Sequence, residues 1–289
     1  MGFHFADDYR ARLLALPTLL RRGGGAPEGA AGALKGGRIE FKDHRPYVQG
    51  DDPRDIDWNS WLRLDALVTK EYSRDEAPEV MVILDRSASM GITGEGKDRI
   101  AREIAGGLLY AGLSARCPVT AVLSAEGGPV TLGTWRTHRK VDEIIAMLEG
   151  LGECDGSTHL TGLRHLKPVA ATGRVAFLVS DFLVESLPAE VAVALARGAG
   201  TGCFVHVVSE AERAPSLPAA CTLVDPESSA RMFVPQSSAL VAAYAEELAS
   251  HEEAVAALAR RHGLGAAVVT DAKPFDRTVQ ALLAGKRSR

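Results

Sequence analysis

The sequence predicts an α/β fold in which helices cover both faces of a mostly parallel sheet. Three observations favour this fold class. Short apolar runs recur from residue 80 onward, and VMVIL is continuous enough to be a strand buried on both faces. Helical patterns alternate with these runs, which indicates parallel strands joined by crossover helices. Two of the runs end on an acid, at Asp85 and Asp181, and the carboxyl ends of such strands are where ligands bind in open sheets.

Residues 1–77 are expected to form an extension ahead of a domain over residues 78–289. Helical spacing of apolar residues predicts an amphipathic helix near the N-terminus, with Tyr9, Leu13, Leu16 and Leu20 on one face. Residues 23–37 are rich in glycine and alanine, which is typical of a loop or linker. IEFKDHRPY and ALVTKEY then suggest two strands. We expect the extension to pack on the domain, because about 40 ordered residues seldom form a core alone.

From residue 80 to the C-terminus, the predicted strands and helices alternate. Strands are expected over residues 80–84, 119–125, 129–135, 174–182, 203–209 and 266–271. Helices are expected over residues 97–115, 137–151, 158–170, 188–200 and 239–263, followed by a short closing helix. Thr137 is expected to cap its helix, and the helix over 188–200 begins with proline and ends with glycine, the usual asymmetry.

Composition limits the possible functions. The net charge of −4 gives no general reason to bind nucleic acid or an anionic membrane. No apolar run reaches the roughly 20 residues of a transmembrane helix, so no membrane insertion is expected. The acids Asp7 and Asp8 precede the first apolar patch, which is the wrong order for a signal peptide. The four cysteines fit neither a zinc site nor a small disulfide framework, so we expect reduced thiols and a cytoplasmic protein.

The stretch VILDRSASM places Asp85, Ser87 and Ser89 at alternate positions directly after a strand. Oxygen ligands of this kind suit a hard divalent cation. Asp181 ends a second strand, and Thr158 lies in a glycine-containing loop between the two. If these side chains converge at one edge of the sheet, they form a small oxygen cage that fits Mg²⁺. The alternative is that Asp85 and the serines only cap the next helix.

Asp85-Arg86-Ser87-Ala88-Ser89 resembles the DxSxS signature of the von Willebrand factor A domain, whose fold is Rossmann-like. In that family the motif, a later threonine and a later aspartate form a metal-ion-dependent adhesion site (MIDAS). The resemblance implies a Mg²⁺ ion, or Mn²⁺ or Ca²⁺, whose open position is filled by a partner's carboxylate. The implied ligands are Ser87, Ser89, Thr158 and Asp181, with Asp85 acting directly or through water. Ser157 stands where the family commonly has glycine.

The segment RIEFKDHRPYVQGDDPRDIDWNSWLRLDALVTKEY resembles the signature of the bacterial domain of unknown function 58 family. The matching positions are Arg45 and Tyr47, Gly50 to Asp52, Arg54 to Trp58, and Lys70 to Tyr72. Together with the A domain, the resemblance covers roughly residues 35 to 289. Members of this family are often linked to MoxR-type AAA+ ATPases in chaperone-like maturation or metal-cofactor insertion. The resemblance therefore implies an adaptor that binds such an ATPase or its substrate.

The charged segment over residues 45–72 has two interpretations. In one, Arg45, Asp51, Asp52 and Trp58 face a protein partner. In the other, the charges form a buried ion-pair network that docks the extension on the domain. That network would consist of Arg45, Asp51, Asp52, Arg54, Asp57 and Arg63.

Catalysis is not expected, because the sequence contains no HExxH motif and no recognisable set of nucleophile, base and orienting group. His206 lies within a predicted strand and is expected to be a core residue. Two alternatives to a metal-dependent adaptor remain open. The oxygen cage could activate water in a phosphoesterase, with Arg86 beside Asp85. The module could also bind partners with an empty site, in which unpaired acids repel one another.

Overall fold

The computed structural model describes residues 3–22, 39–46, 57, 68–74, 77–92, 96–125, 127–154, 160–166, 173–184, 189–198, 201–215, 220–226, 229–235 and 237–283. Its centre is a six-stranded sheet with the order β10-β7-β6-β3-β4-β5. The strands are β3 (Glu79–Leu84), β4 (Val119–Leu123), β5 (Val130–Trp135), β6 (Arg174–Ser180), β7 (Thr201–Val207) and β10 (Gly265–Val269). Neighbouring strands are parallel except β4 and β5. The predicted doubly wound, mostly parallel α/β fold class is confirmed.

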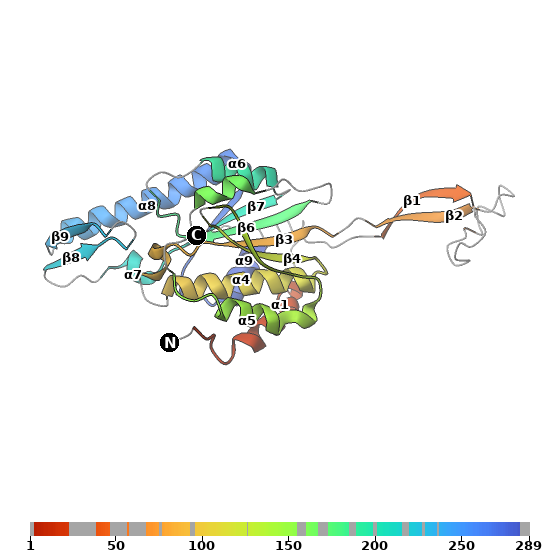
Figure 1. Ribbon diagram of the computed structural model, residues 1–289, viewed down its shortest axis with the longest axis horizontal. Coiled ribbons are helices and arrows are strands. Elements are labelled where there is room, and N and C mark those ends of the chain that lie inside the picture. Colours follow the sequence, from red (N-terminus) through yellow and green to blue (C-terminus); the bar gives the residue numbers. More distant parts are fainter. Residues whose placement is uncertain are drawn as a thin grey trace.

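Helices cover both faces of the sheet (Figure 1). One face carries α1 (Tyr9–Arg22), α4 (Gly96–Ser114), α5 (Val141–Glu149) and α9 (Phe275–Leu283). The other face carries α6 (Ala189–Gly198), α8 (Ser238–Arg261) and the 3₁₀ helix η4 (Leu160–His165). The described residues also include three short helices: η2 (Ala88–Gly91), η3 (His138–Lys140) and α7 (Glu210–Arg213). Thr137 caps η3 as predicted, since its side chain accepts a hydrogen bond from the Arg139 backbone.

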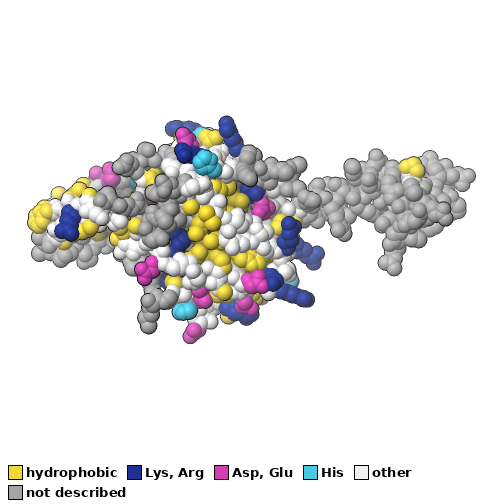
Figure 2. Space-filling model, viewed as in Figure 1, with side chains coloured by type: hydrophobic (Ala, Val, Ile, Leu, Met, Phe, Trp, Pro, Cys, Tyr) yellow, Lys and Arg dark blue, Asp and Glu magenta, His cyan; other side chains and the backbone are white. Residues whose placement is uncertain are grey.

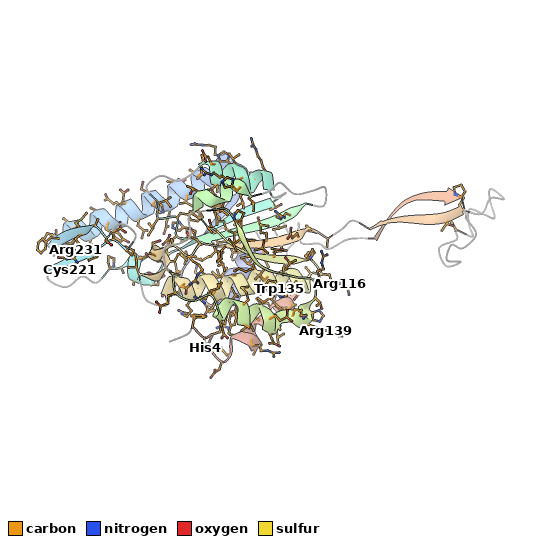
Figure 3. The ribbon with its side chains drawn as sticks, in the orientation of Figure 1. His4, Arg116, Trp135, Arg139, Cys221 and Arg231 are labelled. Carbon is orange, nitrogen blue, oxygen red and sulfur yellow. The ribbon has the colours of Figure 1, made fainter. Side chains whose placement is uncertain are left out.

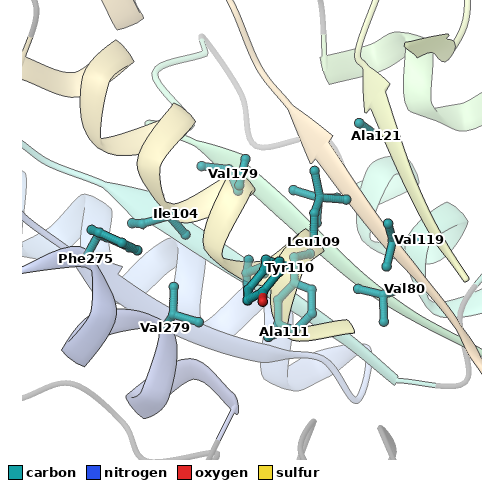
Figure 4. Packing of buried hydrophobic residues seen from close by; sticks show 14 of the residues in the cluster. Val80, Ile104, Leu109, Tyr110, Ala111, Val119, Ala121, Val179, Phe275 and Val279 are labelled. Atoms are coloured by element: carbon teal, nitrogen blue, oxygen red, sulfur yellow. The ribbon is translucent and has the colours of Figure 1, made fainter. Parts of the chain in front are cut away.

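Strand β3 is apolar from Val80 to Leu84 because both of its faces are covered there. Val80, Val82 and Leu84 belong to the hydrophobic cluster beneath α4, part of which is shown in Figure 4. Met81 and Ile83 belong to the cluster beneath α6 and α8 on the opposite face. The strand therefore lies at the centre of the molecule, and the residue after it emerges at the middle of the sheet edge.

The N-terminal extension contributes α1 to the core. Tyr9, Leu13 and Leu16 are buried in the cluster with α4 and α9, and the Tyr9 hydroxyl donates a 2.8 Å hydrogen bond to the Glu103 carbonyl. A Cβ atom on Gly106 of α4 would lie 2.3 Å from that hydroxyl, so glycine allows the two helices to approach. The predicted helix is thus confirmed for these three residues, whereas the Leu20 side chain lies outside the described residues.

Two hairpins extend beyond the central sheet. The two strands that the sequence suggested, β1 (Ile39–Pro46) and β2 (Val68–Arg74), are present and pair in antiparallel fashion. They lie apart from the sheet layers (Figure 1). The extension therefore packs on the sheet through α1, whereas this hairpin lies beyond it. The proposed boundary between residues 77 and 78 remains a prediction.

The second hairpin, β8 (Ala220–Val224) with β9 (Arg231–Pro235), was not predicted. Cys221 and Arg231, one from each strand, lie at the end of the molecule opposite β1 and β2 (Figure 3). Hydrophobic side chains gather on its surface (Figure 2), and Met232 and Phe233 are each 68% exposed. In the described part of the chain, no helix is both long and apolar enough to cross a bilayer.

Candidate metal centre at the carboxyl edge of the sheet

Two of the predicted site residues follow adjacent strands. Asp85 comes directly after β3 and Asp181 directly after β6, and these strands are parallel neighbours. The Asp85 backbone N–H donates a 3.0 Å hydrogen bond to the Val179 carbonyl, which continues the pairing past the end of β3. Both aspartates are buried. The topology therefore brings these two carboxylates to the same edge of the sheet.

Asp85 is held by donors from two segments. Its Oδ1 accepts a 2.9 Å hydrogen bond from the Ser87 backbone, and its Oδ2 accepts one of 2.6 Å from the Ser180 hydroxyl. The Ser180 oxygen in turn accepts from the Phe182 backbone at 2.8 Å. Because each partner is itself fixed, the Asp85 carboxylate has a single orientation. Its contact with the Ser87 backbone is a local turn contact, so the capping interpretation describes part of its role.

The two motif serines lie side by side. Ser87 occupies the N-cap position of η2 but makes no capping hydrogen bond with its side chain. Instead, the Ser87 and Ser89 hydroxyls form a hydrogen bond with each other, with their oxygens 2.9 Å apart. Two adjacent ligands of an octahedral Mg²⁺, each roughly 2.0–2.1 Å from the ion, lie about 2.9 Å from one another. The spacing of these hydroxyls therefore fits two neighbouring positions in a Mg²⁺ shell.

Asp181 is paired with a lysine that the sequence analysis did not single out. Lys97, in the first turn of α4, has no exposed surface. Its ammonium donates to Asp181 Oδ2 at 2.8 Å and to Glu212 Oε1 of α7 at 2.6 Å. Burial alone would lower the pKa of Lys97, but the two carboxylates outweigh that effect and raise the pKa above its usual value. Lys97 therefore stays charged and neutralises part of the acidity at this edge.

One signal in the sequence marks this lysine. Lys97, Ile100, Ala101 and Ile104 follow one another at helical spacing, and all four are buried. A charged residue on the apolar stripe of a helix requires a buried partner. The two strand-end acids, Asp85 and Asp181, are candidates for that partner. Ser180 carried no comparable signal, because it reads as one more position within its strand.

Arg86 and Arg102 form a second group of ion pairs near the motif, in which both contact Asp98. The buried Arg86 side chain donates to Asp98 Oδ1 at 2.9 Å and to the Gly152 carbonyl at 2.8 Å. Arg102 also contacts Asp98, at 2.7 Å. Because Arg86 is held by Asp98 and the Gly152 carbonyl, it contributes to the packing of α4. The phosphoesterase alternative requires instead an arginine that contacts a phosphate group.

The donor set suits a hard, partly hydrated cation. Within the described ranges, no group of three or more His, Cys, Asp or Glu side chains is arranged to hold a metal. The candidate ligands are instead two hydroxyls and a small number of carboxylates, and Mg²⁺ takes few carboxylates while keeping several waters. The residues that the structure describes therefore fit Mg²⁺ better than a soft or nitrogen-bound metal. The predicted ligand Thr158 lies outside the described residues.

Most of the predicted partner-binding residues lie outside the residues that the structure describes. Arg45 lies in β1, where its backbone is opposite Thr69 of β2, whereas Asp51, Asp52 and Trp58 lie outside the described residues. Asp57, which belongs to the alternative ion-pair network, is among the described residues and is buried. Its backbone donates a 2.9 Å hydrogen bond to the Val68 carbonyl. Both interpretations of this segment remain predictions.

A second buried group lies beside the candidate centre. His206 of β7 packs edge-on against the rings of Phe182 and His251, and His251 Nε2 lies 3.3 Å from the Asp181 carbonyl. Burial, and then the charge of His251, lower the pKa of His206 to about 4. His206 is therefore a neutral core residue at physiological pH, as the sequence predicted.

Comparison with known proteins identifies one family. The sequence profile described as "Protein of unknown function DUF58" matches residues 43–254. No curated protein matches the chain.

The chain is also similar to solved structures, but with low sequence identity and low TM-scores. BatB from Bacteroides thetaiotaomicron is 15% identical, with a TM-score of 0.41, over 72% of this chain and 97% of that one. An aerotolerance-related membrane protein from Bacteroides fragilis is 15% identical, with a TM-score of 0.40, over 71% and 96%. Proximal thread matrix protein 1 from the mussel byssus, with a zinc-occupied MIDAS motif, is 14% identical, with a TM-score of 0.34, over 45% and 38%. These scores are low, so the fold assignment comes from the chain's own topology.

Proposed function

Because the chain belongs to the family described as protein of unknown function DUF58, we propose that it acts as a non-enzymatic, metal-dependent protein-interaction module. In this proposal a Mg²⁺ ion is held at the carboxyl edge of the sheet. The chain supplies only part of the coordination shell, and an aspartate or glutamate of a partner protein completes it. The partner is a MoxR-type AAA+ ATPase or a protein that such an ATPase acts on.

The observation that carries the proposal is the pair of serine hydroxyls. Ser87 and Ser89 place two oxygens 2.9 Å apart beside a buried, fixed carboxylate. Hydroxyl oxygens are neutral, so a metal held by them retains positive charge and attracts an anionic ligand. This arrangement favours a binding site for carboxylates over a site that activates water, and the engagement of Arg86 with Asp98 points the same way. The four cysteines form no disulfide, which supports a reducing compartment such as the cytoplasm.

Calorimetric titration of Mn²⁺ and Mg²⁺ tests the proposal. The wild-type protein should bind one metal ion, and Ser87→Ala/Ser89→Ala, which keeps both acids, should lose at least about tenfold in affinity because two ligands are removed. Ser114→Ala is a matched control, since Ser114 at the far end of α4 donates to the Tyr110 carbonyl and lies outside the motif. Equal metal affinity in all three proteins would contradict the proposed ligands.

The partner class needs its own measurement. A purified MoxR-type ATPase should be retained by the immobilised wild-type chain in Mg²⁺ and released by EDTA, because the metal bridges the two proteins. The double serine variant should fail to retain it under both conditions. Retention that EDTA does not change would count against a metal bridge even if the metal site itself is real.

A further inference from the structure

Lys97 gives the candidate centre a built-in positive charge. The side chain has no exposed surface and reaches two carboxylates, at 2.8 Å to Asp181 and 2.6 Å to Glu212. Asp181 directly follows β6 and Glu212 lies in α7, so the ammonium joins α4, the sheet edge and the short helix after β7. A buried ammonium with this many contacts cannot be a solvated surface charge. It is a permanent part of the electrostatics of the site.

The charges around Asp181 can be counted from the ion pairs. Lys97 connects a set of three charged residues: Asp181, Lys97 and Glu212. Two carboxylates and one cation leave a formal net charge of −1. A divalent ion changes this to +1, and one partner carboxylate then brings it to zero. The set is therefore electrically balanced only when the metal and an anion are both present.

Removing the lysine charge would change that balance. Without Lys97 the same set has a net charge of −2, and a divalent ion alone neutralises it. The metal would then bind well without any partner. With Lys97 present, the metal enters a site that already holds a cation next to one of its candidate ligands, and like charges at short range in a buried setting repel strongly.

We propose that Lys97 couples the two binding events, so that the metal and a carboxylate ligand bind tightly only together. This inference rests on the proposed metal site and adds a condition under which that site binds its metal tightly. The chain would hold the ion loosely when alone and firmly once a partner's aspartate or glutamate arrives. Lys97 is a positioning residue here, because it acts through Asp181 and through charge, not by contact with the metal.

Mn²⁺ calorimetry with and without acetate tests the coupling, with acetate as a minimal carboxylate. In the wild type, acetate should tighten Mn²⁺ binding severalfold. In Lys97→Met, Mn²⁺ alone should bind about tenfold more tightly or better, and the effect of acetate should disappear. In Glu212→Gln, which raises the net charge to zero, Mn²⁺ alone should bind about tenfold more weakly and the effect of acetate should grow.

The double variant Lys97→Met/Glu212→Gln is the matched control. It restores the net charge of −1 without the lysine, so its Mn²⁺ affinity and its response to acetate should return toward the wild-type values. It also removes the uncompensated Glu212 that could destabilise Lys97→Met. If the double variant kept the tight binding of Lys97→Met, the lysine would act by blocking Asp181 and the charge coupling would be overturned.

The remaining outcomes separate this inference from the proposed function. If the wild type binds Mn²⁺ and every folded variant shows the same affinity and the same acetate effect, the role of Lys97 is overturned but the proposed metal site is not. Absence of Mn²⁺ binding in all four proteins, with and without acetate, would overturn the proposed metal site and this inference with it. Circular dichroism on each variant identifies those that are folded.

Discussion

At the scale of single residues, His206 makes stability sensitive to acid. Its pKa is lowered to about 4 by burial and by His251, compared with about 6.5 in an unfolded chain. Between these two values the unfolded chain binds a proton that the folded chain does not, so the free energy of unfolding falls as the pH falls from about 6.5 to about 4. Above pH 6.5 this residue has almost no effect, because both states are neutral.

The expected effect is measurable by urea denaturation. Between pH 7 and pH 5 the wild type should lose about 2 kcal/mol more of its free energy of unfolding than His206→Gln, which cannot titrate. The comparison with the variant cancels the carboxylates that titrate in the same range. Identical pH profiles for the two proteins would show that His206 is protonated as readily in the folded state as in the unfolded one.

At the scale of secondary structure, α1 shows how a stripe of apolar residues stabilises the fold. Leu13 is fully buried between α4 and α9, whereas its neighbour Leu14 is 42% exposed on the same helix. Leu13→Ala should lower the free energy of unfolding by about 2–5 kcal/mol, since it leaves a cavity. Leu14→Ala should change it by less than about 0.5–1 kcal/mol. Thermal and urea denaturation of both variants make the comparison.

This pair also tests whether α1 belongs to the folded core. Alanine is the better helix former, so neither substitution weakens the helix itself, and the difference between them reports tertiary packing. If Leu13→Ala were as mild as Leu14→Ala, α1 would not be docked in solution.

The elements differ in how well the sequence predicted them. Strand β3 and helix α4 were assigned correctly because burial on defined faces produces a regular apolar pattern. The β8–β9 hairpin was missed because most of its large apolar residues are exposed. Met232 and Phe233 face solvent, so no alternation between a core face and a polar face marks the strands.

The same limit applies within the candidate site. The motif and both strand-end aspartates could be found from sequence, because each follows an apolar run. The pairing of Lys97 with Asp181 joins residues 84 positions apart, and only the order of the strands brings them together.

At the scale of the whole molecule, the fold should not depend on the metal. Both aspartates are satisfied by the protein: Asp85 by Ser180 and the Ser87 backbone, and Asp181 by Lys97. In EDTA the chain should therefore still unfold cooperatively. With acetate present and Mn²⁺ at about 100 times its dissociation constant, the free energy of unfolding should rise by about 2.7 kcal/mol. Loss of cooperative unfolding in EDTA would mean that the ion is structural.

The position of β3 in the sheet also sets the order in which the centre can form. Asp85 and its donor Ser180 are 95 positions apart in the chain, whereas β3, η2 and α4 are consecutive. Contacts between distant segments require closure of a long loop and tend to be made late in folding. A growing or partly folded chain therefore has the serine motif and Lys97 before it has Asp181 or Glu212. The Lys97 ammonium gains its two partners only when β6 and α7 have packed in place. The candidate centre is therefore complete only after the domain has folded.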